Sequence, residues 1–372
     1  MNNNFDVIVV GGGIYGSVCA YFLGQHHRVL LVERERIGSA GATSYSRGIV
    51  RAYDPDPALA EVSLRGAIEL DQWEERGYPG FNPYRSTGFL YLLPETGAQA
   101  IRQFAERYDS PEYPIHLLRP AEVSRRFPWL RPDPDRIGVF EARGGYGDPR
   151  LTATNFAEGF RTRGGQVYEN CEVRGFEALS DGRWKVQLPL GSVRASVVLF
   201  TTGAYTKRFF PDLPVFTRSI SLTQVSDPAG LVQLPLIDEG VETYYRPGDG
   251  ASFYAGSQVY ARTELHRDLA AHKAAEHEDS MRRIELLMKE SRSHRALNYL
   301  KGFDAYTVDK KPIVQFLEEY PGVYLAAGFS GRGYKCALSL GQQIAQQIRQ
   351  RLGSLATAPE IKWRLSLKDQ FV

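Results

Sequence analysis

The chain of 372 residues has little cysteine, no long apolar run and almost no excess charge. Its three cysteines, Cys19, Cys171 and Cys336, lie far apart and form no CxxC pair. Neither a zinc site nor a disulfide framework is therefore predicted, and we expect no metal ion. So few isolated cysteines are typical of a reducing compartment, which favours a cytoplasmic location.

No run of 18 apolar residues occurs, so no membrane span is expected. The first residues, MNNNFD, contain no basic segment followed by an apolar stretch, and we expect no secretory leader there. The 45 basic residues nearly balance the 43 acidic ones, which leaves a net charge of +2. This balance gives no electrostatic reason to expect a nucleic acid partner.

Glycine, in contrast, is placed conspicuously near the start of the chain. An apolar run at residues 5–10 predicts a buried parallel strand, and Gly11, Gly13 and Gly16 follow it in the pattern GxGxxG. Helical apolar spacing comes next. In this order the first glycine allows a tight turn, the second admits a phosphate to the backbone, and the third lets the helix pack on the strand. The segment predicts a binding loop for a dinucleotide diphosphate.

Glu33 ends the second predicted strand, residues 28–33, and lies 22 positions after the first glycine of the loop. A carboxylate there can accept hydrogen bonds from both ribose hydroxyls, and it would repel a 2′-phosphate. The pattern therefore indicates an adenine dinucleotide with an unmodified ribose. It does not say which dinucleotide.

The rest of the chain alternates between the two kinds of structure. Amphipathic helices are predicted over residues 56–77, 148–165 and 264–291, and residues 214–260 have the alternation of an antiparallel sheet. The fold class is therefore α/β, of mixed α and β character, with a Rossmann-like domain around a parallel sheet and a second domain of antiparallel sheet flanked by helices. The expected boundaries are 1–85, 145–212 and 302–372 for the first domain, and 86–144 and 213–301 for the second.

Three segments carry a resemblance to a known family: ERERIGSAGATSYSRGIVR at 33–51, VVLFTTGAY at 197–205 and YLAAGFSGRGYKCALSLG at 324–341. Together with the glycine loop they resemble the D-amino-acid-oxidase-like flavoproteins, most closely the group of monomeric sarcosine oxidase and glycine oxidase. The resemblance covers nearly the whole chain. It implies that the dinucleotide is FAD and that the protein is an oxidoreductase of amines or amino acids.

The resemblance also implies which residues contact FAD. The turn before the last helix would direct N–H groups from Gly331 to Lys335 at the pyrimidine side of the flavin, where donors stabilise the anionic reduced ring. For Arg332 a structural ion pair is an equal alternative. The implied cofactor-binding residues are Gly11, Gly13, Ile14, Tyr15, Gly16, Glu33, Arg34, Ala42, Thr43, Ser44, Val173, Gly203, Gly331, Arg332, Gly333, Tyr334 and Lys335.

Arg51 and Lys335 match the two cationic positions that bind the substrate carboxylate in the sarcosine oxidase branch. Two cations above the flavin would orient an amino acid for hydride transfer, which needs orientation more than acid–base chemistry. The alternatives are an ion pair between Arg51 and Asp54 and a surface position for Lys335.

A roof over the pocket is expected from the segment ETYYRPGDGASFYAG, residues 242–256. Tyr244, Tyr245, Arg246 and Tyr254 lie on its predicted strands, and an aromatic ceiling suits an amine or an aromatic ring. We expect Tyr245 and Tyr254 to take part in catalysis together with the two cations. Ordinary packing within the sheet is the alternative for each of them.

The chain departs from the sarcosine oxidase branch at the residue that tethers the flavin. Matching DAYTVDKKPIV to that segment places Asp304 or Ala305 where the branch has a cysteine, and Cys336 lies beyond the glycine turn. The resemblance therefore implies FAD held without a covalent bond.

A second group of departures concerns reaction with oxygen. The branch has a lysine over the flavin, but Tyr254 takes that position here, and no lysine occurs between Lys207 and Lys273. Two histidines of the branch are replaced at or near Ser44 and Gln258. Stabilisation of developing superoxide by a lysine is therefore not expected.

Three functions remain open at this point. The first is oxidation of a C–N bond in a small amine or amino acid. The second is a maturation or tailoring flavoprotein that oxidises a biosynthetic intermediate or a side chain of a partner protein, as in the biogenesis of a protein-derived quinone. The third is a flavin-binding fold without catalysis. The substrate, the electron acceptor and the oligomeric state are left undecided.

Overall fold

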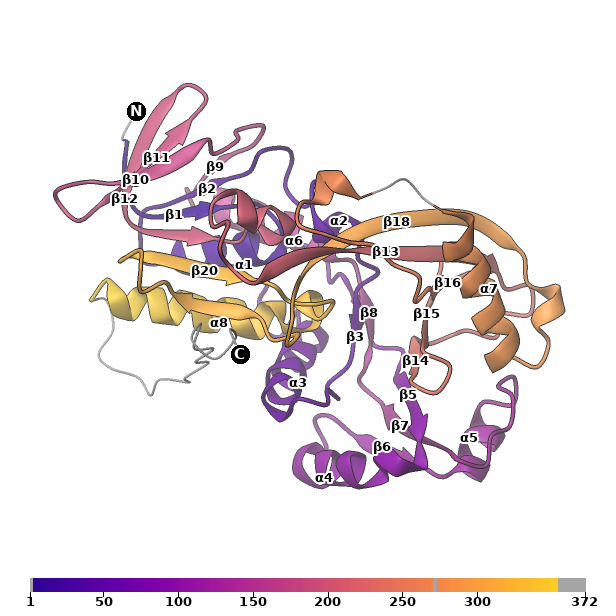
Figure 1. Ribbon diagram of the computed structural model, residues 1–372. Coiled ribbons are helices and arrows are strands. Elements are labelled where there is room, and N and C mark those ends of the chain that lie inside the picture. Colours follow the sequence, from indigo (N-terminus) through magenta and orange to yellow (C-terminus); the bar gives the residue numbers. More distant parts are fainter. Residues whose placement is uncertain (1–2, 270–272, 354–372) are drawn as a thin grey trace.

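The structure is a computed structural model that describes residues 3–269 and 273–353. These residues form an eight-stranded sheet, a nine-stranded sheet and a small three-stranded sheet, with helices packed around them. Figure 1 places the eight-stranded sheet on one side of the molecule and the nine-stranded sheet on the other. The α/β fold class predicted from the sequence is confirmed.

The eight-stranded sheet has a parallel centre, because β12, β1, β2 and β9 pair side by side in the same direction and β20 joins β12. Antiparallel strands extend it at its edges. Its strands are β1 (Asn4–Val10), β2 (Val29–Val32), β9 (Gln166–Tyr168), β10 (Gly175–Ala178), β11 (Trp184–Leu188), β12 (Gly191–Phe200), β19 (Ile313–Phe316) and β20 (Val323–Ala327). Residues 7–10 are all buried, as expected for a central strand covered on both faces.

Four helices pack against one another beside this sheet: α1 (Ile14–Leu23), α3 (Pro57–Asp71), α6 (Pro149–Thr162) and α8 (Gly333–Arg351). The α3–α8 contact is unusually close. A β-carbon at Gly66 would overlap the main-chain carbonyl oxygen of Lys335, so only glycine fits at that position. Ser63 and Cys336 are 3.4 Å apart across the same contact, and the Ser339 hydroxyl donates to the carbonyl oxygen of Val62 at 2.8 Å.

The nine-stranded sheet is mainly antiparallel and has the order β17-β13-β16-β15-β14-β5-β7-β6, with β18 on β13. Only the β14–β5 pair is parallel. Its strands are β5 (Phe89–Pro94), β6 (Ile115–Leu118), β7 (Arg136–Glu141), β13 (Val215–Ser226), β14 (Leu236–Asp238), β15 (Thr243–Pro247), β16 (Ser252–Gly256), β17 (Arg262–Thr263) and β18 (Ala296–Thr307). The helices α4 (Ala98–Tyr108), α5 (Pro120–Arg126) and α7 (Ala274–Leu287) flank it (Figure 1).

The three-stranded sheet joins β3 (Ile49–Val50), β8 (Gly145–Gly147) and β4 (Tyr84–Arg85). The short helix α2 (Ala42–Tyr45) lies shortly before β3. No helix in residues 3–269 and 273–353 is both long enough and apolar enough to cross a bilayer.

Two helix predictions were too long. The helix predicted over 264–291 is α7 alone, because the Glu276 side chain accepts the Lys273 backbone N–H and starts the helix there. Residues 266–268 form a short 3-10 turn, and residues 270–272 lie outside the described part. The helix predicted over 56–77 starts as expected, since Asp56 accepts N–H groups of the first turn, but it ends at Asp71.

The division into two discontinuous domains stays a prediction. The strands of the eight-stranded sheet lie within 1–85, 145–212 and 302–372, and those of the nine-stranded sheet lie within the other two ranges, except that β18 crosses from one range into the other. Residues 1–2 and 354–372 of the proposed boundaries lie outside the described part of the chain.

Candidate active site

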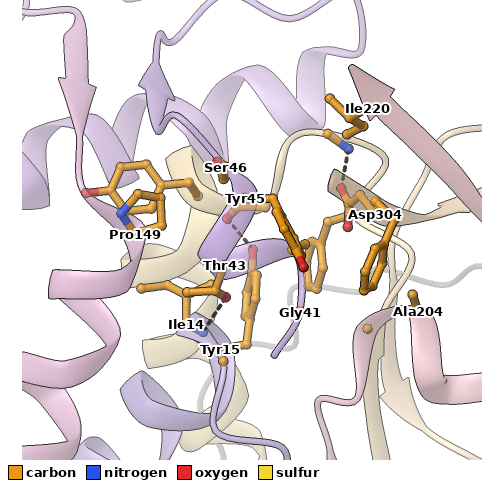
Figure 2. A pocket seen from close by; sticks show the side chains of 18 of the residues that line it. Ile14, Tyr15, Gly41, Thr43, Tyr45, Ser46, Pro149, Ala204, Ile220 and Asp304 are labelled. Carbon is orange, nitrogen blue, oxygen red and sulfur yellow. Dashed lines mark hydrogen bonds between the residues drawn. The ribbon is translucent and has the colours of Figure 1, made fainter. Parts of the chain in front are cut away.

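A single cavity of about 480 Å³ runs from the glycine loop after β1 to the roof formed by the nine-stranded sheet (Figure 2). Both large sheets contribute to its wall, with Val10 and Ala326 from one and Ile220 and Tyr244 from the other. Of the predicted cofactor-binding residues, all line this cavity except Gly16 and Ser44. The fold therefore brings together segments that are more than 300 positions apart in the chain.

The glycine loop has the backbone shape that its sequence predicts. Gly11 has a φ of +106°, and a β-carbon on it would come within 2.8 Å of the Thr201 carbonyl oxygen. A β-carbon at Gly16 would overlap the carbonyl oxygen of Gly11, so Gly16 serves the close packing of helix on loop. The Ile14 N–H at the start of α1 donates to the Thr43 hydroxyl at 3.1 Å (Figure 2). The loop and the helix start fit a dinucleotide diphosphate.

Glu33 lies directly after β2 and is held by the backbone around it. One of its oxygens accepts the Gly12 N–H at 2.6 Å, and the other accepts the Glu35 N–H at 2.9 Å. Burial raises the pKa of this carboxyl, against the effect of the two hydrogen bonds. Each oxygen has a second lone pair, so ribose hydroxyls can still donate to it. The Arg34 guanidinium lies 3.8 Å over the Tyr205 ring and donates to its hydroxyl at 2.6 Å.

The turn before α8 contains fewer free donors than the sequence suggested. The Gly331 N–H donates to Asp304 at 2.9 Å, and the Arg332 N–H donates to the Phe329 carbonyl at 3.0 Å. The next three N–H groups, residues 333–335, begin α8 and therefore have no acceptor inside the helix. They remain the suitable donors for an anionic ring at this end of the cavity.

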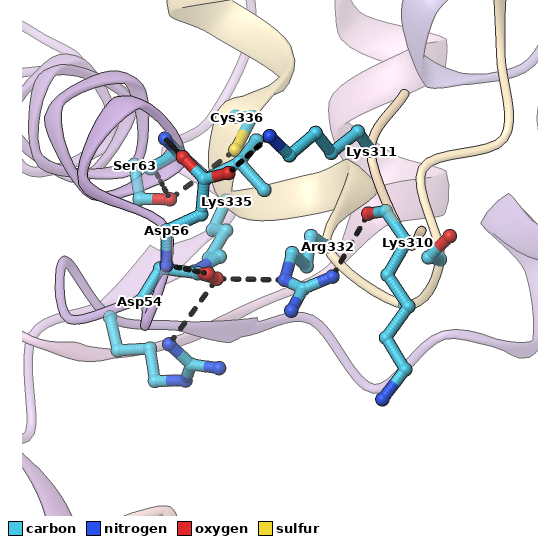
Figure 3. A network of polar contacts seen from close by, with 12 residues as sticks. Asp54, Asp56, Ser63, Lys310, Lys311, Arg332, Lys335 and Cys336 are labelled. Atoms are coloured by element: carbon cyan, nitrogen blue, oxygen red, sulfur yellow. Dashed lines mark hydrogen bonds and ion pairs between the residues drawn. The ribbon is translucent and has the colours of Figure 1, made fainter. Parts of the chain in front are cut away.

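Asp54 joins the cationic residues at the far end of the cavity (Figure 3). Its buried carboxylate lies 2.7 Å from Nε of Arg332, 3.1 Å from Nζ of Lys335 and 3.9 Å from an Nη of Arg51. Thus Arg51 and Lys335, the two residues predicted to bind the substrate carboxylate, do lie close together. The ion pairs considered as alternatives for Arg51 and Arg332 are present as well. Three cations share one carboxylate, so the cluster has two positive charges in excess.

Burial and these charges shift the pKa values of the cluster. Burial would raise the pKa of the Asp54 carboxyl, but Lys335, Arg51 and Arg332 together lower it to about 2. Burial, and then the charge of Arg51, lowers the pKa of the Lys335 amine to about 8, although Asp54 opposes the change. An added anion would therefore meet a positive and partly desolvated centre.

The roof of the cavity corrects one sequence prediction. Tyr244 lines the cavity, whereas Tyr245 is fully buried on the opposite face of β15, where its ring packs 5.1 Å from that of Phe253. Alternation along a strand requires this, because successive side chains point to opposite faces. Tyr245 therefore does not belong to the roof of the pocket. Tyr254 faces the same side as Tyr244, since it pairs with Arg246 across β15 and β16, but neither Tyr254 nor Arg246 is among the residues that line the cavity.

Two further charged residues of the cavity wall had no clear signal in the sequence. Arg218, on β13, lies 3.6 Å over the Tyr260 ring, and its register partner on β18 is Asp304. Burial raises the pKa of the Asp304 carboxyl to about 6, against backbone hydrogen bonds from Gly331 and Ala305. The alternation of β13 would have placed Arg218 on one face with Ile220. It could not have shown which face meets the cavity.

Comparison with known proteins supports the same family. The family model described as "DAO: FAD dependent oxidoreductase" matches residues 6–347. N-methyl-L-tryptophan oxidase of Yersinia pestis is 24% identical over 92% of this chain and 94% of its own length. Mitochondrial sarcosine dehydrogenase of Mus musculus is also 24% identical, but this chain spans only 39% of its length, and it spans 29% of human mitochondrial dimethylglycine dehydrogenase.

Solved structures agree on the fold. L-proline dehydrogenase from P. horikoshii superposes with a TM-score of 0.83 at 20% identity, over 94% of this chain and 95% of that one. Glycine oxidase from Geobacillus kaustophilus gives a TM-score of 0.80 at 20% identity, with the same coverage of both chains. The resemblance noted in the sequence is thus confirmed, and the chain belongs to the DAO family of FAD-dependent oxidoreductases.

Proposed function

We propose that this protein oxidises a C–N bond of an amino acid or a secondary amine that carries a carboxylate. The observation that carries the proposal is the cluster of Arg51, Lys335 and Arg332 around one buried Asp54 at the end of the cavity. The names of the relatives support it, since sarcosine dehydrogenase and N-methyl-L-tryptophan oxidase act on amino acids with an N-methyl group.

In this proposal the residues of the chain orient the substrate. Arg51 and Lys335 bind the carboxylate through charge-assisted hydrogen bonds, and Asp54 holds both cations in place. Tyr244 and Ile237 close the roof over the substrate and exclude water. Bound FAD would accept a hydride from the carbon beside the nitrogen, while the nitrogen lone pair forms the C=N bond of an imine that water then hydrolyses.

We further propose that FAD is held without a covalent bond. Asp304 lines the cavity and Ala305 follows it on β18, and neither side chain can form a thioether. Cys336 is buried in the α3–α8 contact beside Ser63 and does not line the cavity. Acid precipitation of the purified protein should leave all of the yellow cofactor in the supernatant, and flavin retained in the pellet would contradict the proposal.

The decisive experiment is anaerobic reduction of the flavin by a panel of amino acids and N-methyl amino acids. At least one member should bleach the 450 nm region, and readmission of air then measures whether oxygen reoxidises the flavin quickly, as in an oxidase, or slowly. Arg51→Met and Lys335→Met should each raise the substrate Kd about 10-fold or more, with flavin content unchanged. Failure of every member of the panel to reduce the flavin would refute the function.

The alternative of a flavoprotein that modifies a partner protein receives no support from the comparisons, whose enzymes are named for small substrates. The cytoplasmic location stays a prediction. It rests on the three cysteines, which are all free thiols in the structure.

A further inference from the structure

The wall of the cavity contains an arginine for which the described residues supply no acidic partner. Arg47 lines the cavity just before β3, and its Nε is buried without a hydrogen-bond partner. Its guanidinium lies 4.7 Å from the centre of the Tyr254 ring, whose π face partly offsets the positive charge. A buried polar atom without a hydrogen-bond partner is costly unless a ligand supplies that partner.

A second cation, Arg246, lies close to Arg47. The Arg246 guanidinium lies 4.2 Å over the Tyr146 ring and 5.7 Å from the centre of the Tyr254 ring, and its Nε donates to the Arg47 carbonyl at 3.2 Å. Burial lowers the pKa of Arg246, and the charge of Arg47 contributes in the same direction. The charge of Asp249 opposes this effect on the pKa of Arg246. No carboxylate of the described residues forms an ion pair with either arginine, so the two form a positive region separate from the Asp54 cluster.

The sheet register separates the two positive regions. Arg51 lies 5.1 Å over the Tyr91 ring on β5, and Tyr91 pairs with Ile237 on β14, which in turn pairs with Tyr244 on β15. Tyr254 is one strand further, on β16. Three strand spacings put the backbones of β5 and β16 about 14 Å apart. The two arginines therefore approach different ends of one roof, with Ile237 and Tyr244 between them.

The cofactor diphosphate is a poor candidate for the missing partner of Arg47. The diphosphate loop is fixed at the other end of segment 43–47, where Thr43 accepts the Ile14 N–H. The guanidinium of Arg47 is directed from there to Tyr254 in the roof. It thus lies on the substrate side of the cavity.

We infer that the substrate carries a second acidic group, several bonds from its α-carboxylate. Arg51 and Lys335 hold the α-carboxylate, and Arg47, supported by Arg246, holds the second anion under the Tyr254 ring. The substrate class is thus an acidic amino acid or an amine with two carboxylates. This inference rests on the proposed function, because it places the α-carboxylate in the Asp54 cluster.

The test measures binding and turnover in parallel on the FAD-loaded protein. Calorimetry compares glutarate with butyrate, which differ only in the second carboxylate and cannot be oxidised at a C–N bond. Anaerobic flavin reduction compares alanine, N-methylglycine, aspartate, glutamate, 2-aminoadipate and iminodiacetate. Each assay is repeated with Arg47→Met and with Arg262→Met, an exposed arginine on β17 whose guanidinium lies over the Phe216 ring.

We expect the wild-type protein to bind glutarate about 10- to 100-fold more tightly than butyrate and to prefer a diacid as substrate. Arg47→Met should remove that preference, leave butyrate binding within about twofold, and leave flavin content unchanged. Arg262→Met should behave as the wild type. Equal binding of glutarate and butyrate, or a diacid preference that survives Arg47→Met and is removed by Arg218→Met, overturns the inference.

The outcomes separate this inference from the proposed function. If neutral amino acids reduce the flavin as well as diacids do, the proposed function stands and the inference fails. If no amine reduces the flavin, the proposed function fails. If Arg47→Met instead releases FAD, the arginine serves the cofactor and the inference fails.

Discussion

The carboxylate of Asp54 offers the sharpest test of how the site is held together. The substitution Asp54→Asn keeps the shape of the side chain and removes the negative charge that Arg332, Lys335 and Arg51 share. Breaking a buried ion pair by removing one partner typically costs about 3–5 kcal/mol, since the remaining charge stays desolvated. We expect a loss of free energy of unfolding in that range at pH 7.

The pH dependence of this loss follows from the pKa of Asp54. Its pKa is lowered from 3.8 to about 2 in the folded protein. At about 1.4 kcal/mol for each pH unit between the two values, the carboxylate contributes about 2.5 kcal/mol above pH 4. Because the folded pKa is the lower one, this contribution is present at neutral pH and is lost as the pH falls from about 4 to about 2. The difference between wild type and Asp54→Asn should therefore shrink over that interval.

Urea unfolding of the FAD-saturated protein, followed by tryptophan fluorescence at pH 7 and at pH 3, measures both effects. Asp181→Asn is the matched control, since Asp181 is paired with Arg183 on the surface, where solvent screens the ion pair and its loss changes stability little. A loss below about 1 kcal/mol at pH 7, or a loss equal to that of the control, would refute the idea that Asp54 organises the cluster. If Asp54→Asn does not fold, Asp54→Glu, which keeps the charge, should fold.

Three further results are expected. The Gly11→Ala variant should lose most of its FAD affinity and about 1–3 kcal/mol of stability, because Gly11 has a φ of +106°. The control Gly175→Ala, where the added β-carbon meets only ordinary contacts, should retain both, and equal FAD content in the two variants would contradict this. The Kd of butyrate should rise as the pH passes about 8, where Lys335 loses its proton, and Lys335→Arg should move that rise to higher pH; a flat profile up to pH 10 would exclude the role. Tyr245→Phe should leave kcat/KM within about twofold and stability unchanged or higher, because its hydroxyl is buried without a partner; a tenfold loss in kcat/KM would restore Tyr245 to the site.

The glycine loop and Glu33 could be singled out from the sequence, because the constraint at that end of the cavity is local. Gly11, Gly13 and Glu33 act through backbone geometry within one strand–helix–strand unit, and spacing alone identifies such a unit. The prediction that Arg51 and Lys335 bind the substrate carboxylate came from the resemblance to a family. What the sequence could not give was Asp54 as the common partner, because the three cations reach it from segments that fold together only in three dimensions.

The sequence also could not predict which face of the roof strands meets the cavity. In the segment TYYRP, residues 243–247, neighbouring side chains are similar in size and polarity, so alternation predicts two faces without identifying the one that meets the cavity. The choice between Tyr244 and Tyr245 depends on pairing with β14 and β16, which no local pattern reveals. The start of α7 was missed because charged residues continue across the capping box without a break.

The close contact between α3 and α8 has a consequence for how variation along the chain should be interpreted. Gly66 packs against the backbone of Lys335 and does not line the cavity, and any larger residue there would displace the lysine from Asp54. In a saturation mutagenesis scored by turnover, substitutions of Gly66 should be tolerated as poorly as substitutions of Arg51 and Lys335. Loss-of-function positions on the buried face of α3 would then map the support of the lysine, and should not be mistaken for a second ligand pocket.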